Sequence, residues 1–199
     1  MDLNILYAGV GGQGIITSAV VVGEASIKEG INVVMSEIHG LSQRGGTVNV
    51  EMKIGDSKSP LIEDYSTDIV VGMEPVEVYR LNNKLNHDTE VILNVVPIVP
   101  FTVSIGSSKY PNKIDLISYL EKNFKNIYKI DAEGIASKAG NKIAASMVFV
   151  GCLAGLNITK KVIRKGSFEE AIKDHFPQKF YEVNLKAFEL GYKAVSNPE

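Results

Sequence analysis

The chain has 199 residues, of which 45% are hydrophobic and 22% are charged, with a formal net charge of −2 at pH 7. These values are those of an average globular protein, and the length favours one domain over two. The small net charge excludes the basic surface of a nucleic-acid-binding protein and the basic patch of a protein that binds anionic membranes. Small molecules and other proteins remain as the expected partners.

Neither a secretory signal nor a membrane span is predicted. Met1 leads into residues 2–7 without a basic segment or an apolar segment that ends in a cleavage site. The apolar run at 143–158 contains Ser146 and two glycines and is shorter than the roughly 20 residues that a bilayer requires. We expect this run to form a buried helix and the protein to be cytoplasmic.

The single cysteine, Cys152, lies inside that apolar run. A free cysteine in such a setting is typically a buried structural thiol. An iron–sulfur cluster normally needs four thiolates, so this chain cannot hold one by itself. His87 and His175 have no other His or Cys at metal-ligand spacing, and no metal site is predicted.

The first 35 residues predict a strand, a helix and a second strand. An apolar run of strand length at 3–8 leads into a glycine cluster, and apolar residues then recur at helical spacing up to Glu29. Gly30 ends the helix, and a strand follows at 31–35. This βαβ unit implies a parallel sheet with a right-handed crossover.

Alternating strands and helices continue as far as residue 130. A polar, glycine-rich loop is predicted at 36–46, and the alternation at 47–54 predicts a strand with one solvent-exposed face near the sheet edge. The remaining elements of this part are strands at 68–71, 90–96 and 127–130 and helices at 75–81 and 113–123.

The pattern becomes helical after Asp131, which is a plausible N-cap. A long apolar helix is predicted at 141–156, and Ser167 opens a capping-box pattern for a helix that ends at Phe176. A last amphipathic helix covers about 179–195.

The fold class is therefore α/β, with a Rossmann-like, mostly parallel sheet, flanking helices and a helical C-terminal third. We expect residues 1–199 to form a single domain, in which residues 131–199 pack on an α/β core of about residues 1–130.

The glycine cluster matches the pattern G-x-G-x-x-G and lies between the first strand and the first helix. Glycines permit a tight turn and close backbone approach, while the helix N-terminus offers N–H groups and partial positive charge to a phosphate or carboxylate. The alternative is that the glycines only allow close packing of strand and helix. The residues concerned are Gly9, Val10, Gly11, Gly12, Gln13 and Gly14.

A second motif follows the second strand. A carboxylate, an imidazole, an amide and a guanidinium lie within eleven residues at 36–46, together with three glycines. So many directional polar groups at the carboxyl end of a strand indicate recognition of a ligand or partner. Within it, Glu37 also lies where a nicotinamide-binding protein has an acidic residue, so an NAD enzyme is one candidate class.

Together the two motifs resemble the gamma-type domain of 2-oxoacid:ferredoxin oxidoreductases, and residues 39–46 are similar to the beta subunit of the indolepyruvate type. Segments at 72–75, 94–98 and 139–141 extend the resemblance over most of the chain. Where the family pattern has a proline and an asparagine, this chain has Lys142 and Ser146, which puts a family role for Asn141 in doubt.

The resemblance implies oxidative decarboxylation of a 2-oxoacid, with CoA, to acyl-CoA and CO2, with electrons passed to ferredoxin. It places thiamine diphosphate, Mg and the [4Fe–4S] clusters mainly on a larger partner subunit, and none on this chain alone. The chain would complete the active site of that subunit and approach CoA or the substrate. A free-standing NAD-dependent oxidoreductase and a purely structural docking module remain alternatives.

The resemblance places catalysis on the larger subunit, so no residue of this chain is assigned a catalytic role. Glu37 and His39 are the candidates for catalysis, since in an extended segment their side chains point the same way and could share a proton or a hydrogen bond. Arg44 could grip a phosphate or carboxylate, or form a salt bridge to the partner. Gln13 and Gln43 could bind cofactor oxygens or hold their own loops. The candidates for cofactor binding are Gly9, Gly11, Gly12, Gln13, Gly14, Gln43, Arg44, Gly45 and Gly46.

Overall fold

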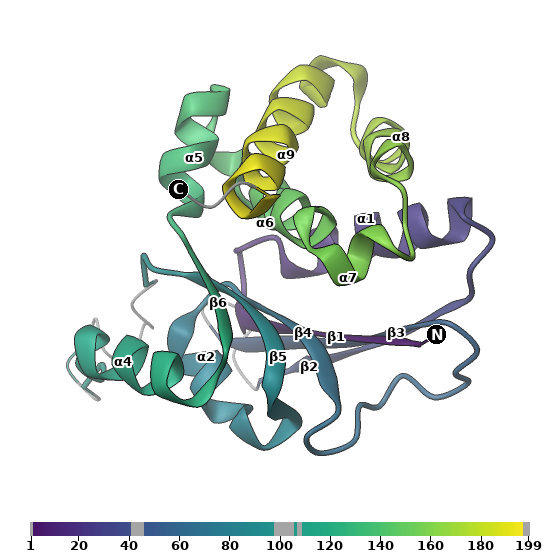
Figure 1. The fold of residues 1–199 in the computed structure, drawn as a ribbon. Helices are drawn as coiled ribbons and strands as arrows, with labels where there is room; N and C mark the ends of the chain where they lie inside the picture. The colour runs from purple at the N-terminus through teal and green to yellow at the C-terminus, as the bar shows by residue number, and fades with distance from the viewer. Residues whose placement is uncertain (1, 41–45, 98–105, 107–108, 197–199) are drawn as a thin grey trace.

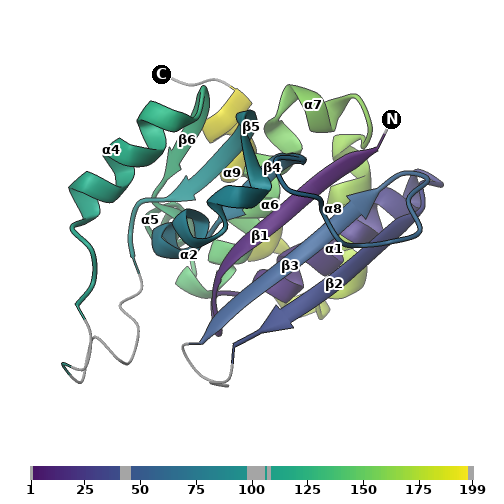
Figure 2. The ribbon, with the colours of Figure 1, turned by 90° about the horizontal axis from the view of Figure 1, so that it is seen from below.

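The computed structural model describes residues 2–40, 46–97, 106 and 109–196, and the described strands form one sheet in the order β2-β3-β1-β4-β5-β6 (Figure 2). β1, β4, β5 and β6 are parallel, whereas β3 runs antiparallel to β1 and β2. The predicted mostly parallel sheet is confirmed. The bounds are β1 (Leu3–Val10), β2 (Val33–His39), β3 (Thr47–Ile54), β4 (Thr67–Gly72), β5 (Leu85–Asn94) and β6 (Asn126–Ile130).

Helices cover both faces of the sheet, with α1 and the C-terminal helices on one face and α2 and α4 on the other (Figure 1). The helical C-terminal third is therefore confirmed, and its apolar side joins α1 in the larger of two cores. The helices are α1 (Ile15–Lys28), α2 (Pro75–Arg80), α4 (Lys113–Asn123), α5 (Ala132–Ala139), α6 (Ala145–Gly155), α7 (Asn157–Lys160), α8 (Lys165–His175) and α9 (Tyr181–Ser196).

Two expectations about β2 and β3 were wrong. The loop predicted at 36–46 starts too early, because residues 36–39 are still part of β2. All of β2, from Val33 to His39, pairs with β3. β3 has no solvent-exposed face: Asn49 is 7% exposed and Glu51 is 4% exposed. Glu51 is covered because its carboxylate accepts a hydrogen bond from the Ile62 N–H (2.5 Å) and lies 3.6 Å from Lys84 Nζ.

The apolar run at 143–158 forms α6 and packs closely on α9. A Cβ atom at Gly151 would lie 2.0 Å from the Phe188 carbonyl oxygen, and one at Gly191 would lie 2.1 Å from that of Val148. Glycine at both positions lets the two backbones touch, and Cys152 beside them is fully buried, as predicted. No helix in the described part of the chain is long and apolar enough to cross a membrane.

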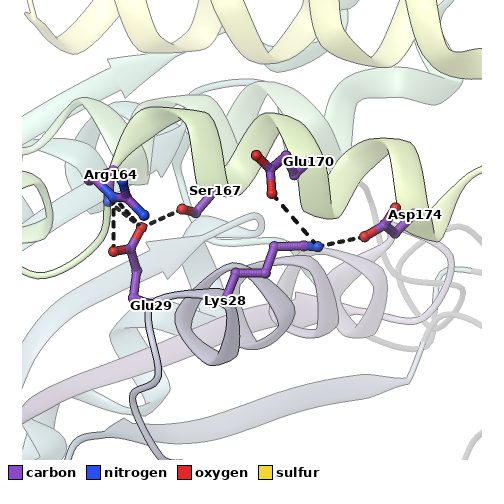
Figure 3. A network of polar contacts seen from close by, with 6 residues as sticks. All are labelled: Lys28, Glu29, Arg164, Ser167, Glu170 and Asp174. Carbon is purple, nitrogen blue, oxygen red and sulfur yellow. Dashed lines mark hydrogen bonds and ion pairs between the residues drawn. The ribbon is translucent and has the colours of Figure 1, made fainter.

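A polar network joins the end of α1 to α8 (Figure 3). The predicted capping role of Ser167 was wrong, because α8 begins at Lys165 and Ser167 Oγ instead donates to the Glu29 carboxylate. Arg164 Nε lies 3.0 Å from the same carboxylate, and Lys28 Nζ lies 2.6 Å from Asp174 Oδ2. These bonds hold the C-terminal helices to α1.

The helix after β1 and the helix after β4 lie on opposite faces of the sheet (Figure 1). In a parallel sheet, such a switch opens a crevice at the carboxyl ends of the two strands, where ligands generally bind. The glycine cluster follows β1 at this point, and residues 73–74 follow β4.

Candidate functional site at the glycine loop

The glycine loop, residues 9–14, turns the chain from β1 into α1. Gly12 and Gly14 have φ angles of 102° and 76°, which L side chains rarely adopt. Gly14 is the N-cap of α1 and makes no side-chain cap. A Cβ atom there would lie 2.8 Å from the Ser146 Cβ of α6, so glycine is also needed for close packing.

Gln13 folds back over the loop that contains it. Its Oε1 accepts a hydrogen bond from the Val10 N–H at 2.8 Å, and its Nε2 donates to the Met73 carbonyl at 2.8 Å. Gly9 makes room for this arrangement, because a Cβ atom there would lie 2.5 Å from Gln13 Oε1. Of the two roles that the sequence allows, the geometry favours loop support for Gln13.

A cavity of about 320 Å³ opens between the glycine loop and helices α5 and α6. Its wall combines the first turn of α1 with one lysine, one glutamate and two phenylalanine rings. The lining residues are Gly12, Gln13, Gly14, Thr17, Asn94, Ala132, Glu133, Lys142, Ile143, Ala145, Ser146, Phe149 and Phe176.

A second cavity, of about 430 Å³, lies on the other side of the same loop, toward the end of β2. It shares Gly12, Gly14 and Thr17 with the first cavity. Its lining residues are Val10, Gly11, Gly12, Gly14, Ile15, Ile16, Thr17, His39 and Val48. The start of α1 is therefore accessible from both sides.

The first cavity can accept a ligand that is anionic at one end and apolar at the other. The first N–H groups of a helix have no partner within the helix and carry partial positive charge, and Lys142 adds a full charge at the rim. Phe149 and Phe176 provide an apolar wall. Glu133 also lines this cavity and adds a carboxylate to its wall.

The structure brings the two sequence motifs together. The Gly11 N–H donates to the Gly46 carbonyl at 2.9 Å, so the glycine loop is joined to the end of the second motif. Gln43, Arg44 and Gly45 lie outside the described residues, and their roles stay predictions.

The two catalytic candidates, Glu37 and His39, form a pair at the end of β2. His39 Nε2 lies 3.1 Å from Glu37 Oε2, so the hydrogen bond that their spacing in an extended segment allows is present. The side chains are 52% and 33% exposed. His39 also lines the second cavity, whereas Glu37 does not appear in either wall. Participation of this pair in chemistry stays a prediction.

The strand order argues against dinucleotide binding in the usual nicotinamide manner. There the acidic residue ends a strand adjacent to β1. Here β3 lies between β1 and β2, which places Glu37 two strands, or about 10 Å, from β1. Glu37 is in addition paired with His39.

Sequence reasoning did not single out Asn94 or Lys142 as site residues. Asn94 is 5% exposed and its Nδ2 donates to the Met73 carbonyl at 3.2 Å and to the Val96 carbonyl at 2.8 Å. A signal was available for Asn94, because a polar residue that ends an apolar strand lies at the same sheet edge as the glycine loop.

A buried carboxyl cluster lies beside the glycine loop at the start of α2. Glu74 is fully buried, accepts from the Val76 N–H at 3.3 Å, and is hydrogen-bonded by the Tyr110 hydroxyl. Glu77, 2% exposed, is paired with Arg80 at 2.6 Å. Burial raises the pKa of Glu77, and burial followed by the hydrogen bond to Glu74 raises the pKa of Tyr110.

An iron–sulfur cluster does not fit this chain, because its one cysteine is fully buried in α6 and burial raises the pKa of the thiol. Within the described residues, no group of three or more His, Cys, Asp or Glu side chains lies close enough to hold a metal ion.

The fold and the glycine loop place this chain among the Rossmann-like α/β domains that have a ligand-binding loop after the first strand. Residues 4–194 match the family described as pyruvate ferredoxin/flavodoxin oxidoreductase, and the chain belongs to that family.

A curated relative, the indolepyruvate oxidoreductase subunit IorB of Archaeoglobus fulgidus, is 40% identical over 98% of this chain and 97% of its own length. A gamma subunit of a keto/oxoacid ferredoxin oxidoreductase from Geobacter sulfurreducens has the same fold, with a TM-score of 0.70 and 22% identity over 97% of this chain and 98% of that one.

The fold also occurs within a longer chain. A 2-oxoglutarate:ferredoxin oxidoreductase from Magnetococcus marinus, solved with 2-oxoglutarate, coenzyme A and succinyl-CoA, matches with a TM-score of 0.72 and 19% identity. The match covers 100% of this chain and 32% of that one. The same architecture is thus found both as a separate subunit and as part of a larger polypeptide.

Proposed function

We propose that this chain, as a single domain of residues 1–199, is the small subunit of a cytoplasmic indolepyruvate:ferredoxin oxidoreductase. The complex converts an aryl 2-oxoacid and CoA to acyl-CoA and CO2, and two electrons pass to ferredoxin. Full-length identity of 40% to an indolepyruvate oxidoreductase subunit supports the substrate class.

The observation that carries this proposal is the glycine loop, where α1 begins between two cavities at the switch point of the sheet. The loop has the position and chemistry of an anion site. The chain lacks the cysteines for a cluster, so electron transfer belongs to a larger partner subunit.

In this proposal the chain binds and orients CoA. The first N–H groups of α1 and the ammonium of Lys142 would hold a phosphate, and Phe149 with Phe176 would exclude water from the pantetheine arm. Thiamine diphosphate, bound with Mg on the partner, would supply the carbanion chemistry. Gln43, Arg44 and Gly45 would contribute from the second motif.

The experiment is purification of the tagged chain from its native cells, followed by visible spectroscopy and a CoA-dependent assay with indolepyruvate and ferredoxin. We expect a brown complex with a larger, cysteine-rich subunit, and CoA-dependent reduction of ferredoxin. A colourless single chain that binds NAD would disprove the proposal. A brown complex that prefers pyruvate or 2-oxoglutarate would retain the subunit role and reject the aryl substrate.

A further inference from the structure

Three segments at the carboxyl edge of the sheet meet at the main-chain carbonyl of Met73. Gln13 Nε2 donates to this oxygen at 2.8 Å from the loop after β1, and Asn94 Nδ2 donates at 3.2 Å from the end of β5. The Met73 N–H in turn donates to the Ala8 carbonyl of β1 at 2.8 Å. Since a carbonyl oxygen has two lone pairs, the two amides can bind it together.

This meeting point is shielded from solvent. Met73 is fully buried and Asn94 is 5% exposed. A buried amide or carbonyl that loses its partner is not compensated by water, so these bonds resist breaking. Gln13 links the Met73 carbonyl to the glycine loop, because its Oε1 accepts a hydrogen bond from the Val10 N–H at 2.8 Å. A chain of hydrogen bonds thus runs from the Asn94 side chain to the Met73 carbonyl, and from there through the Gln13 side chain to the glycine loop.

The hydrogen bonds of Asn94 indicate support of the loop, although the residue lines the first cavity. Its Nδ2 is occupied by the Met73 and Val96 carbonyls at 3.2 and 2.8 Å. Its Oδ1 lies 3.5 Å from the Val96 N–H.

We propose that Asn94 is a positioning residue, which acts through the Met73 carbonyl and Gln13 to hold the glycine loop in the conformation that receives CoA. The identity of the ligand rests on the proposed function. The restraint on the loop does not, and it can be measured without turnover.

The test substitution is Asn94→Asp, which keeps the shape of the side chain and removes the Nδ2 donor. The same strand offers a matched control at its other end. Asn86 Nδ2 donates to the Tyr65 carbonyl at 2.9 Å and the Thr67 carbonyl at 3.4 Å, and its Oδ1 accepts from the Asp88 N–H at 2.9 Å. Asn86→Asp therefore removes the same kind of bonds at the edge of the sheet opposite the glycine loop.

The first readout is amide hydrogen exchange of residues 9–17 in the purified complex. We expect Asn94→Asp to speed exchange there by about tenfold, the effect of losing roughly one buried hydrogen bond, and Asn86→Asp to leave it unchanged. Equal exchange in the wild type and in Asn94→Asp would overturn the proposal.

The second readout separates binding from chemistry. Asn94→Asp should raise KM for CoA by about tenfold while KM for the 2-oxoacid and kcat stay within about twofold, and Asn86→Asp should change none of them. If both variants raise KM for CoA equally, the effect is a general loss of stability and the positioning role is rejected. A wild-type complex without activity would reject the proposed function, and hydrogen exchange would still decide the positioning role.

A second variant covers the case in which Asn94→Asp does not fold. Gln13→Glu keeps the oxygen that accepts from Val10 and removes the donor to the same Met73 carbonyl. It should reproduce the faster exchange of the glycine loop, and where both single variants fold, their effects should not add in the double variant. Wild-type amide exchange of the glycine loop in Gln13→Glu would show that the hydrogen bond to the Met73 carbonyl does not restrain the loop. Effects of the two substitutions that add fully in the double variant would show that they do not act through the same carbonyl.

Discussion

The guanidinium Nε of Arg164, just before α8, lies 3.0 Å from the carboxylate of Glu29, just after α1. The same carboxylate accepts from the Ser167 hydroxyl (Figure 3). The two residues lie far apart in the sequence, and their contact joins the C-terminal helices to the first helix of the chain.

Glu29→Gln should lower stability near neutral pH and remove one source of acid sensitivity. The hydrogen bond from Ser167, followed by that from Arg164, holds the pKa of the Glu29 carboxyl below its ordinary value of 4.5. A lowered pKa in the folded state stabilises the protein above that ordinary value, and this stability is lost as the pH falls through the folded-state pKa.

Thermal unfolding of wild type and variant between pH 7 and pH 3 checks this prediction. The Tm of Glu29→Gln should be lower by about 2–4 °C at pH 7, and the difference should shrink below pH 4.5. The exposed Glu63 provides the control, since Glu63→Gln should follow the wild-type curve. A difference that stays constant with pH would show that ionisation of Glu29 is not the cause.

Gly151→Ala should separate α6 from α9. The added methyl group would lie 2.0 Å from the Phe188 carbonyl oxygen, and backbone cannot move aside as a side chain can. We expect a loss of about 1–3 kcal/mol of unfolding free energy, as for other overpacked cores, measured by urea denaturation. Gly166→Ala in α8 is the control: no atom lies within 4 Å of its added Cβ, and helix propensity should stabilise it by about 0.5–1 kcal/mol.

Cys152 should not react with thiol reagents while the protein is folded. Its side chain is fully buried, so a reagent cannot reach the sulfur. Burial also raises the pKa of the thiol, so the reactive thiolate is not formed. Labelling with dithionitrobenzoate at pH 8 should modify the thiol only after denaturant is added. Rapid labelling of the native chain would show that α6 opens locally.

Lys142→Gln in the assembled complex should weaken CoA binding. The ammonium lies at the rim of the first cavity, and loss of one partly exposed charge contact should raise KM for CoA by about three- to tenfold without changing kcat. Lys138, exposed on α5, does not line either cavity, so Lys138→Gln should behave as wild type. Equal KM values in all three proteins would remove Lys142 from the site.

Arg44→Ala distinguishes ligand binding from docking at the second motif. Loss of turnover in a complex that still assembles, measured by size-exclusion chromatography and the CoA-dependent assay, is expected if the guanidinium binds an anion. Failure of the two subunits to co-elute would instead assign Arg44 to the partner interface. Unchanged assembly and turnover would exclude it from both roles.

Much of the fold was predictable because its signals are local. The apolar run at 3–8, the glycines that follow it and the helical spacing up to Glu29 define a strand, a loop and a helix without reference to the rest of the chain. The burial of Cys152 and the N-cap at Asp131, whose Oδ1 accepts from the Gly134 N–H at 2.8 Å, were likewise evident from their neighbours.

The two motifs also allowed the family to be predicted, because their residue types and spacing are specific. The order of the strands in the sheet, by contrast, could not be predicted from local signals. The alternation at 47–54 shows a strand, but whether that strand lies at an edge or between β1 and β2 depends on hydrogen bonds to segments elsewhere in the chain.

The sequence by itself therefore determined the α/β class, the glycine loop and the resemblance to oxidoreductase subunits, since each depends on residues that are close in the chain. The tertiary structure decided that Ser167 binds Glu29 instead of capping α8, and that Gln13 and Asn94 share the carbonyl of Met73. These contacts join residues many positions apart. The contacts of Gln13 and Asn94 exist because β1, β4 and β5 are neighbouring parallel strands whose ends lie at one edge of the sheet, whereas the contact of Ser167 depends on the packing of α8 against α1.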